Sequence, residues 1–396
     1  MNNWKSKKFG NSAELIKETY TPVKNESLSY VGLEHIQQNT LQLIGIGDSS
    51  QTTSNKFKFK QGDILFGKLR PYFRKVICPN FDGVCSTDIF VIRSKSGVEQ
   101  HFLFYWMVSQ EFINFASSGS TGTKMPRADW EFLCELERRL PTPKEQKRIS
   151  NILWALDETI KNCKNQINIL EKIIQTIFKS KFVDFNGQTE FVDSELGKIP
   201  KKWNAGTLED VSDIYSGGTP STKDENYWDG GVNWLSSGET RNNFIIDTER
   251  KISLEGVKNS STSEAHKYDV VIASAGQGNT RGQTSLLFID TYVNQSIIVL
   301  HSKKNNLYSL FLFCNIKSRY EELRGLSDSN SSRGSLPKNI VVTVPVIIPT
   351  DEILLEFNDE TKSILDKIEV NEKQIQHLLS IRESLLPKLM TGEIKI

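Results

Sequence analysis

The stretch from Lys144 to Phe182 decides the fold, and it reads KEQKRISNILWALDETIKNCKNQINILEKIIQTIFKSKF, with no glycine or proline. Its apolar residues recur at alternating steps of four and three: Ile149, Leu153, Leu156, Ile160, Cys163, Ile167, Leu170, Ile174 and Ile177. This period of about 3.5 residues predicts a helix with an apolar seam that packs against a partner helix. Pro141 and Pro143 mark its start, and Thr142 or the carboxylate of Glu145 suits a first helical turn.

A second stretch near the C-terminus repeats the period from Leu354 to Leu389. We expect Asn371 to fix the register of this seam, and Arg382 to lie at its edge with the head group in water. Each helix would exceed about 50 Å, which favours a mutual antiparallel coiled coil over two separate amphipathic helices lying on globular domains. The predicted seam residues are Ile149, Leu153, Leu156, Ile160, Ile167, Leu170, Ile174, Ile364, Ile368, Asn371, Ile375, Leu378 and Leu385.

The segments outside the two helices resemble each other weakly, at a displacement that rises from 199 to 211 residues. Such a drift is what insertions and deletions in the loops of a duplicated unit would produce. Four matches occur in the same order: Trp4 with Trp203, Asp63 with Asp269, the run 86–92 with 294–300, and Pro126 with Pro337. The chain is therefore predicted to be an internal repeat of about 200 residues, each copy a domain followed by a long helix.

The predicted fold class is mixed α/β (α+β), with two similar globular domains separated by the two long helices. Short strands are expected at Gly62–Phe66, Ile89–Ile92, Val270–Ser274 and Ile297–Leu300, and helices at Phe102–Phe115 and Leu307–Leu323. The predicted divisions are a first domain at 1–143, the central helix at 144–184, a second domain at 185–347 and the C-terminal helix at 348–396.

Charge is unevenly distributed although the 396-residue chain has a net charge of only +1. Residues 1–184 carry 26 basic and 19 acidic side chains, whereas residues 185–396 carry 23 and 29. Neutrality is thus a cancellation, and a net charge near zero is compatible with a local basic surface. No apolar run is long enough for a membrane span, and the N-terminal residues lack the apolar region of a signal peptide, so we expect a cytoplasmic protein with no membrane partner.

Motifs for catalysis and metal binding are missing or incomplete. The five cysteines form no C-x-x-C pair and the five histidines are scattered, so no zinc site is predicted. The stretch from Gly62 to Leu69 fits a phosphate-binding loop except at its last position, where Leu69 cannot ligate magnesium. There is no Asn-Pro-Pro-aromatic tetrapeptide of the kind that amino-methyltransferases use. We interpret the chain as non-catalytic, with no metal or cofactor of its own.

A basic strip interleaved with aromatic residues runs from Lys56 to Lys75. Alternation at 56–60 would place lysines on one strand face and phenylalanines on the other. Basic side chains neutralise phosphates, and arginine can also contact guanine edges. The alternative is an ordinary solvated strand face. The predicted DNA-binding residues of the first domain are Lys58, Lys60, Lys68, Arg70, Tyr72, Arg74 and Lys75, with Thr121, Lys124 and Arg127 from a Ser/Gly-rich loop.

The second domain has a thinner version of this pattern around a Gly-rich segment. Asparagine and glutamine can pair with adenine edges, although flexible turns would explain the same residues equally well. The predicted DNA-binding residues of this domain are Arg241, Gln277, Asn279, Arg281, Arg333 and Lys338.

Four motifs in this order resemble the DNA-specificity subunit of type I restriction-modification systems. They are LPTPKEQKRI at 140–149, GKIPKKW at 197–203, GGTPS at 217–221 and RESLLPKLMTG at 382–392. The resemblance covers the whole length. The second helix opens without the full Pro-x-Pro-x-x-Glu-Gln pattern, and the first domain lacks the Gly-x-Ile-Pro-x-x-Trp entry, which leaves open whether partners dock symmetrically at the two ends.

The resemblance implies two target-recognition domains that each read one half of a split site in double-stranded DNA, with the coiled coil setting the gap. It also implies two modification subunits and usually two restriction subunits as partners. Those partners, and not this chain, would use S-adenosylmethionine, ATP and magnesium. The alternatives are a stand-alone DNA-binding regulator, an interaction scaffold that ignores DNA, and a nuclease or methyltransferase with an unrecognised site.

Overall fold

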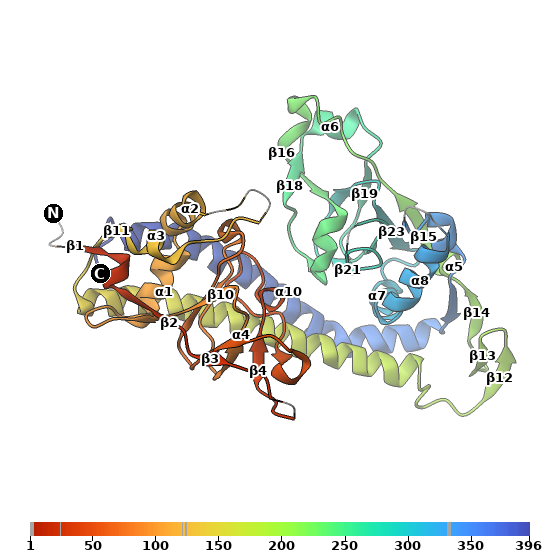
Figure 1. The fold of residues 1–396 in the computed structure, drawn as a ribbon. Coiled ribbons are helices and arrows are strands. Elements are labelled where there is room, and N and C mark those ends of the chain that lie inside the picture. The colour runs from red at the N-terminus through yellow and green to blue at the C-terminus, as the bar shows by residue number, and fades with distance from the viewer. Residues whose placement is uncertain (1–3, 24, 121, 123–124, 277, 331–333) are drawn as a thin grey trace. The chain divides into compact units, whose positions relative to one another are not determined.

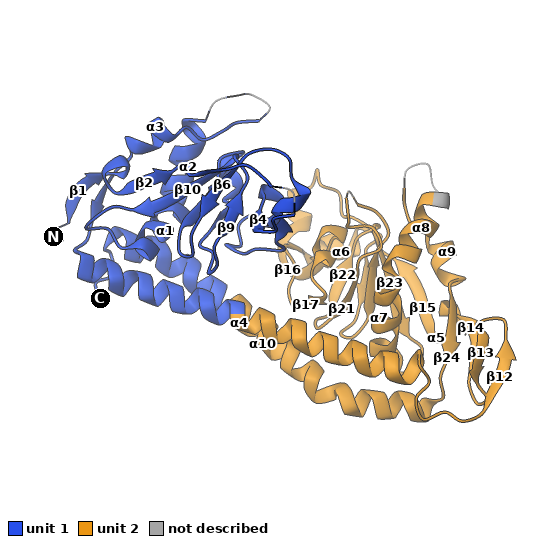
Figure 2. Ribbon diagram, turned by 60° about the horizontal axis from the view of Figure 1, so that its bottom comes forward, with its two compact units in different colours: residues 1–161, 377–396 blue, residues 162–376 orange. Residues whose placement is uncertain are grey.

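The computed structural model describes residues 4–23, 25–120, 122, 125–276, 278–330 and 334–396 (Figure 1). The chain forms two compact units: unit 1 comprises Met1–Lys161 and His377–Ile396, and unit 2 comprises Asn162–Gln376 (Figure 2). Two long helices, α4 (Pro143–Phe182) and α10 (Asp351–Thr391), run through both units. Each unit therefore contains a globular part and one segment of each long helix.

The start of α4 is fixed by a capping box, as its sequence predicts. The backbone N–H of Thr142 donates to the Glu145 carboxylate at 2.9 Å, and the Thr142 hydroxyl donates to it at 2.8 Å. These hydrogen bonds lower the pKa of Glu145. Pro143 occupies the first helical position, where its missing N–H removes nothing.

The two helices pack side by side and antiparallel within each unit. In unit 2, Gln166 accepts a hydrogen bond from the Asn371 amide at 3.0 Å, and Lys181, further along α4, pairs with Glu356 at 2.8 Å, earlier on α10. In unit 1, Asp157 of α4 pairs with Arg382 of α10 at 2.8 Å. The antiparallel arrangement is thus confirmed, and Asn371 has a partner on the facing helix as a register-fixing residue requires.

The seam residues lie on the covered faces of the helices. Buried are Ile149, Leu153, Ile160, Ile167, Ile174, Ile368, Asn371 and Ile375. Half-buried are Leu156, Leu170, Ile364, Leu378 and Leu385. The expectation for Arg382 was wrong, because its side chain is 9% exposed and its guanidinium is held by Asp157 instead of water. The apolar period does not show that the facing helix carries the Asp157 carboxylate, and this carboxylate holds the Arg382 guanidinium inside the seam.

The long helices also pack on the globular parts. They therefore form a coiled coil with each other and at the same time lie as amphipathic helices on the domains. In unit 1, Ile149 and Leu153 share a core with Tyr105 and Trp106. In unit 2, the ring of Phe182 lies 5.0 Å from that of Phe311. Each long helix thus buries one face against its partner helix and its own domain together, which makes the domain and the helix pair one cooperative structure.

The described residues of unit 1 form three small sheets. The strand orders are β1-β11, β2-β10-β7-β8 and β3-β6-β9-β4-β5. The strands are β1 (Lys5–Lys8), β2 (Ala13–Ile16), β3 (Thr19–Tyr20), β4 (Ser29–Val31), β5 (Gly47–Asp48), β6 (Lys56–Phe59), β7 (Ile64–Gly67), β8 (Val76–Ile77), β9 (Gly83–Cys85), β10 (Ile89–Ser94) and β11 (Glu137–Leu140). The helices of its globular part are α1 (Gln100–Val108), α2 (Gln110–Ser118) and α3 (Trp130–Cys134).

Unit 2 repeats this plan with corresponding strands. Its orders are β14-β24, β15-β23-β20-β21-β17 and β18-β16-β22-β19, and a hairpin β12-β13 follows α4. The strands are β12 (Phe191–Ser194), β13 (Gly197–Pro200), β14 (Asn204–Thr207), β15 (Ser212–Ser216), β16 (Trp228–Leu235), β17 (Phe244–Ile245), β18 (Arg250–Ile252), β19 (Ser263–Ala265), β20 (Val270–Ala273), β21 (Thr284–Leu287), β22 (Thr291–Val293), β23 (Ile297–Ser302) and β24 (Pro345–Ile348). Its helices are α5 (Leu208–Val211), α6 (Leu254–Lys258), α7 (Ser309–Ser318), α8 (Tyr320–Asn330) and α9 (Lys338–Val342).

The predicted repeat and mixed fold class are confirmed down to individual bonds. The parallel pair β4–β9 of unit 1 corresponds to the parallel pair β16–β22 of unit 2. The matched aspartates occupy the same place: buried Asp63 pairs with Arg93 at 2.8 Å, and buried Asp269 pairs with His301 at 2.7 Å. Duplicated buried carboxylates, one paired with an arginine and the other with a histidine, are typical of a copied unit that has diverged.

Both predicted domain helices are broken where one continuous helix was expected. The stretch Phe102–Phe115 divides into α1 and α2 at Ser109, whose extended backbone ends one helix and begins the next. The stretch Leu307–Leu323 divides into α7 and α8 at Arg319. Polar residues stand at both corners, Ser109–Glu111 and Lys317–Arg319, and Ser109 caps α2 by accepting from the N–H of Phe112.

A titratable carboxyl lies in the helix pair of unit 2. Burial raises the pKa of Glu372 to about 7, and the neighbouring Glu171 carboxylate adds to the effect. Because this pKa exceeds the unfolded value of about 4.3, unit 2 should lose stability as pH rises from about 4.5 to about 7. We expect Glu372→Gln to stabilise unit 2 by about 2 kcal/mol at pH 8 and by much less at pH 5. Urea unfolding at both pH values measures this, with exposed Asp366→Asn as the control; equal effects at the two pH values would contradict it.

Within the described ranges, none of the helices has the length and apolar composition needed to cross a membrane. The same residues contain no group of three or more His, Cys, Asp or Glu side chains arranged to hold a metal ion.

Candidate nucleic-acid interface

The hairpin between β7 and β8 carries half of the predicted basic residues of unit 1, and we call residues 68–75 loop A. The N–H of Gly67 donates to the Lys75 carbonyl at 2.9 Å, which closes the loop. A second segment lies against loop A. The N–H of Arg70 donates to the Pro126 carbonyl at 2.7 Å, and the N–H of Ala128 donates to the Lys68 carbonyl at 2.9 Å. Loop A and the segment ending at Ala128 therefore form one surface.

Three side chains of this surface suit contact with a polyanion. Tyr72 is 50% exposed, and its ring packs edge-on against Phe73. The ammonium of Lys68 lies 5.0 Å from the Phe90 ring centre, and partial burial lowers its pKa. Arg127 is exposed and its Nε donates to Asp88 at 3.2 Å. A partly desolvated lysine gains more from a phosphate than a fully hydrated one does.

Arg70 and Arg74 bracket the 3₁₀ turn Pro71–Phe73 and both adopt left-handed backbone conformations, with φ of 50° and 46°. For a residue with a Cβ this conformation costs roughly 1 kcal/mol and is found mainly where the surrounding structure or function requires it. Loop A is therefore held in a specific shape that its own backbone does not favour.

Two predicted DNA-binding residues of loop A point into the protein instead. The guanidinium of Arg74 donates to the Gln110 side chain on α2, and burial lowers its pKa. The ammonium of Lys75 donates to the Leu33 carbonyl at 2.5 Å. Both are half-buried, so their charges serve the packing of loop A in the free protein.

The fold divides the basic strip of residues 56–75 between two sheets. Lys60 precedes β7 and Lys68 follows it, so the two lie at opposite ends of that strand. Lys58, on β6 in a different sheet, is exposed and pairs with Glu18 at 3.2 Å. The predicted alternation fails at Lys56, which is only 3% exposed and donates to the Ser54 carbonyl at 2.6 Å. The spacing of charges along the sequence does not reveal the turn at 60–63, which separates Lys58 and Lys60 from loop A.

The corresponding hairpin of unit 2 joins β20 to β21, and we call residues 274–283 loop B. The N–H of Ala273 donates to the Gln283 carbonyl at 2.9 Å, which corresponds to the bond from the N–H of Gly67 to the Lys75 carbonyl in loop A. The N–H of Leu336 donates to the Ser274 carbonyl at 2.7 Å, which corresponds to the bond from the N–H of Ala128 to the Lys68 carbonyl in unit 1. The two predicted sites are therefore copies of one arrangement, a hairpin loop joined to a segment after the second domain helix.

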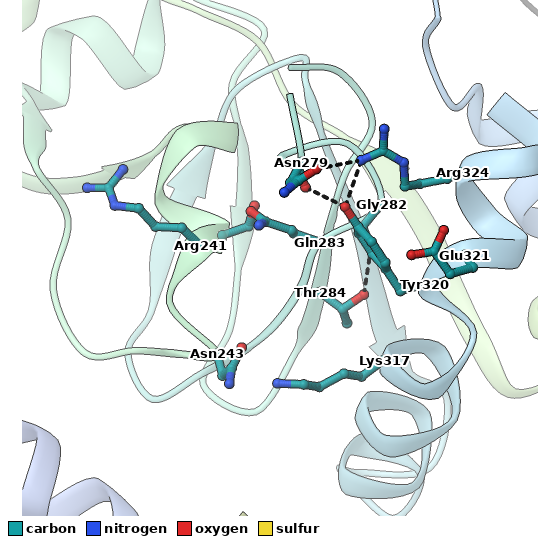
Figure 3. A pocket seen from close by; sticks show the side chains of 11 residues that line it. Arg241, Asn243, Asn279, Gly282, Gln283, Thr284, Lys317, Tyr320, Glu321 and Arg324 are labelled. Atoms are coloured by element: carbon teal, nitrogen blue, oxygen red, sulfur yellow. Dashed lines mark hydrogen bonds between the residues drawn. The ribbon is translucent and has the colours of Figure 1, made fainter. Parts of the chain in front are cut away.

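Loop B borders a pocket of about 570 Å³ with mixed donors and acceptors (Figure 3). Arg324 and Tyr320 of α8 lie against Asn279 on one side, while Arg241 and Gln283 lie on the other. The Gln283 side-chain oxygen is buried with no hydrogen-bond partner in the structure. The lining is Thr240, Arg241, Asn243, Asn279, Gly282, Gln283, Thr284, Lys317, Tyr320, Glu321 and Arg324.

The pocket brings together two predicted residues of unit 2, Arg241 and Asn279. Arg241 ends the 3₁₀ turn Ser237–Arg241 and pairs with Glu249. Arg281 donates to the Gly334 carbonyl at 2.5 Å and also pairs with Asp328, so it fastens loop B to the next segment. Lys338 is exposed at the start of α9 and does not line the pocket. Thr121, Lys124, Gln277 and Arg333 lie outside the described residues.

Lys317, Tyr320 and Arg324 line the pocket but were not among the predicted residues. Lys317 is already paired with Glu171 at 2.5 Å. The sequence held a usable signal for the other two, since a displacement of 210 aligns Tyr320 with Gln110, the first residue of α2.

Comparisons with known proteins agree with this architecture. Residues 1–172 and 200–379 match the type I restriction modification DNA specificity domain. The MjaIX specificity subunit of a type I restriction enzyme from Methanocaldococcus jannaschii is 27% identical over 310 residues, covering 77% of this chain and 71% of that protein. The HindI specificity subunit of Haemophilus influenzae is 22% identical over 464 residues and covers both chains completely.

A solved structure shares the fold. The crystal structure of the type I restriction-modification S subunit from M. genitalium covers 98% of this chain and 96% of its own, with a TM-score of 0.59 and 18% sequence identity. The two matched segments of the family model fall on the two copies of the repeat and together span most of the chain. The chain therefore belongs to the family of type I restriction modification DNA specificity domain proteins.

Proposed function

We propose that this chain is the sequence-specific DNA-recognition subunit of a type I restriction-modification complex, in which each unit reads one half of a bipartite target. The observation that carries this proposal is the duplication of one loop arrangement, with loop A in unit 1 and loop B in unit 2 closed by the same backbone bonds. Two similar but chemically different loops on one chain suit two different half-sites.

The side chains of the loops suit base and phosphate contacts. Lys68, Arg70 and Arg127 offer positive charge beside the exposed ring of Tyr72 in unit 1. Asn279 and Arg241 offer an amide and a guanidinium at the pocket of unit 2. Guanidinium groups recognise guanine edges and phosphates, and amides recognise adenine edges, so loops A and B would prefer different bases.

The long helices would set the gap between half-sites and support the partner subunits. In this proposal two modification subunits, and two restriction subunits where the host has them, supply the chemistry. S-adenosylmethionine, ATP and magnesium would bind to those partners, and this chain would be non-catalytic and act in the cytoplasm. Continuity of α4 and α10 through both units supports the spacing role, because a helix transmits a change in length from one unit to the other.

Methylation mapping tests the proposal. The chain is co-expressed with its cognate modification subunit, and modified bases are mapped across the genome of the host cell. We expect methylation confined to one split sequence, and none from either protein alone. Purified chain that turns over DNA by itself, with magnesium and a methyl donor, would instead indicate an enzyme. DNA binding with no modification-subunit complex would indicate a regulator.

A charge-matched pair of variants tests which end of β7 contacts DNA. We expect Arg70→Ala with Arg127→Ala to weaken binding of the methyltransferase complex about ten-fold and to lower the slope of log Kd against log salt by about 2. Lys58→Ala with Lys60→Ala removes the same charge at the other end and should leave both unchanged. Fluorescence anisotropy at several salt concentrations measures them; equal losses from the two pairs would refute the assignment to loop A.

A further inference from the structure

Loop B needs support from outside itself to hold one shape. Gly276, Gly278 and Gly282 all have positive φ, at 152°, 60° and 85°. Glycine in such conformations fixes no single backbone geometry, because it loses more conformational freedom on ordering than any other residue. A loop that must present a side chain to a base edge within a fraction of an ångström therefore requires an external clamp.

The structure provides this clamp from α8. The Tyr320 hydroxyl donates to the Asn279 carbonyl at 2.7 Å. One guanidinium nitrogen of Arg324 donates to the Tyr320 hydroxyl at 2.8 Å and lies 3.4 Å from the Asn279 side-chain oxygen (Figure 3). The same nitrogen donates to the Gly278 carbonyl at 3.1 Å. Two residues one turn apart on a single helix thus hold the backbone of loop B at successive residues.

Unit 1 has a corresponding clamp at the matching positions of its second domain helix, but the guanidinium and the amide have changed places between helix and loop. Gln110 and Asn114 lie one turn apart on α2 and are joined by a 2.7 Å hydrogen bond, as Tyr320 and Arg324 are on α8. Gln110 accepts from Arg74 of loop A. In unit 1 the guanidinium belongs to the loop and the amide to the helix, whereas in unit 2 the guanidinium belongs to the helix and the amide to the loop.

From this exchange we infer that Tyr320 and Arg324 in unit 2, and Arg74 with Gln110 in unit 1, are positioning residues that fix the two DNA-reading loops independently of each other. The inference rests on the proposed function. It reassigns Arg74 from a DNA contact to a loop support, and it assigns specificity for the second half-site partly to a helix that carries no predicted DNA contact. Loss of one clamp would then loosen one half-site only.

The decisive variants are Arg324→Met and Arg74→Met in the full chain, co-expressed with the modification subunit. Arg324→Met should reduce discrimination at the second half-site about ten-fold and leave the first half-site unchanged, and Arg74→Met should do the reverse. Arg324→Lys, which keeps the positive charge and one donor nitrogen, should recover part of the loss. Arg319→Met is the matched control, because that guanidinium pairs with Glu322 and the Pro345 carbonyl and not with loop B.

Hydrogen exchange of the purified chain separates the possible failures. Arg324→Met should speed exchange at least ten-fold in residues 274–283 and leave the strands of unit 2 protected. Unchanged exchange in loop B, or a variant that relaxes both half-sites equally, would overturn the inference while the proposed function stands. If the wild-type chain directs no methylation to a split site, the proposed function fails, and faster exchange confined to loop B would still establish the clamp.

Discussion

Replacing Arg382 with methionine should destabilise unit 1 by about 3 kcal/mol, because it removes a buried guanidinium from a half-buried carboxylate. The Arg382 guanidinium donates to Asp157 at 2.8 Å, and the other oxygen of that carboxylate accepts from the Tyr105 hydroxyl at 2.6 Å. Tyr105 is fully buried, and burial together with the Asp157 charge raises its pKa. Without Arg382, the negative charge would face a phenol and an apolar core. Urea unfolding, followed by hydrogen exchange in unit 1 peptides, measures the loss.

A second variant separates loss of the cation from loss of packing. Arg382→Met combined with Asp157→Leu removes both charges and leaves an apolar pair, so it should recover most of the stability lost in the single variant. Lys388→Ala, an exposed position on the same helix segment, serves as the control and should change stability by less than about 0.5 kcal/mol. A double variant as unstable as the single one would mean that packing of the arginine stem, and not charge, supports this junction.

The elements that could be predicted are those specified by periodicity over many residues. The seam from Ile149 to Ile174 needed only its spacing, because an apolar stripe on a long helix has to be covered whatever lies opposite. Four matches in the same order, Asp63 with Asp269 among them, identified the repeat, since a duplicated unit keeps the order of its parts while its loops change length. The resemblance to the family was predicted from four motifs that lie near the beginnings and ends of the domains and long helices.

The details of the interface could not be predicted, since they depend on where the chain turns. Lys60 and Lys68 are close in sequence, yet a turn and one strand separate them. Arg74 and Arg127 look equivalent as basic residues, but the first is half-buried against α2 and the second is exposed. Only the left-handed backbone at Arg74 and the position of Gln110 decide this, and neither leaves a signal in the composition of the loop.

Lengthening both long helices by one heptad should move the methylated half-sites apart without changing their sequences. The insertions belong after Lys161 in α4 and after Gln376 in α10, where the two helices pass from one unit to the other. Seven residues add about 10 Å and keep the apolar seam in register, whereas other lengths would rotate it. At about 3.4 Å per base pair, the gap should grow by about three base pairs, and methylation at the original target should fall below detection.

The matched control places the heptad in α4 alone. That variant has the same extra residues in one helix, but its seam would be seven residues out of step across the junction. The pair Gln166–Asn371 on one side and the pair Asp157–Arg382 on the other could then not both form. We expect it to lose stability and to direct no methylation, because a helix pair transmits length only when both partners extend together. Methylome sequencing of cells that express each variant with the modification subunit gives the answer directly. An unchanged gap in the doubly extended protein would show that the helices hold the recognition domains without setting their spacing.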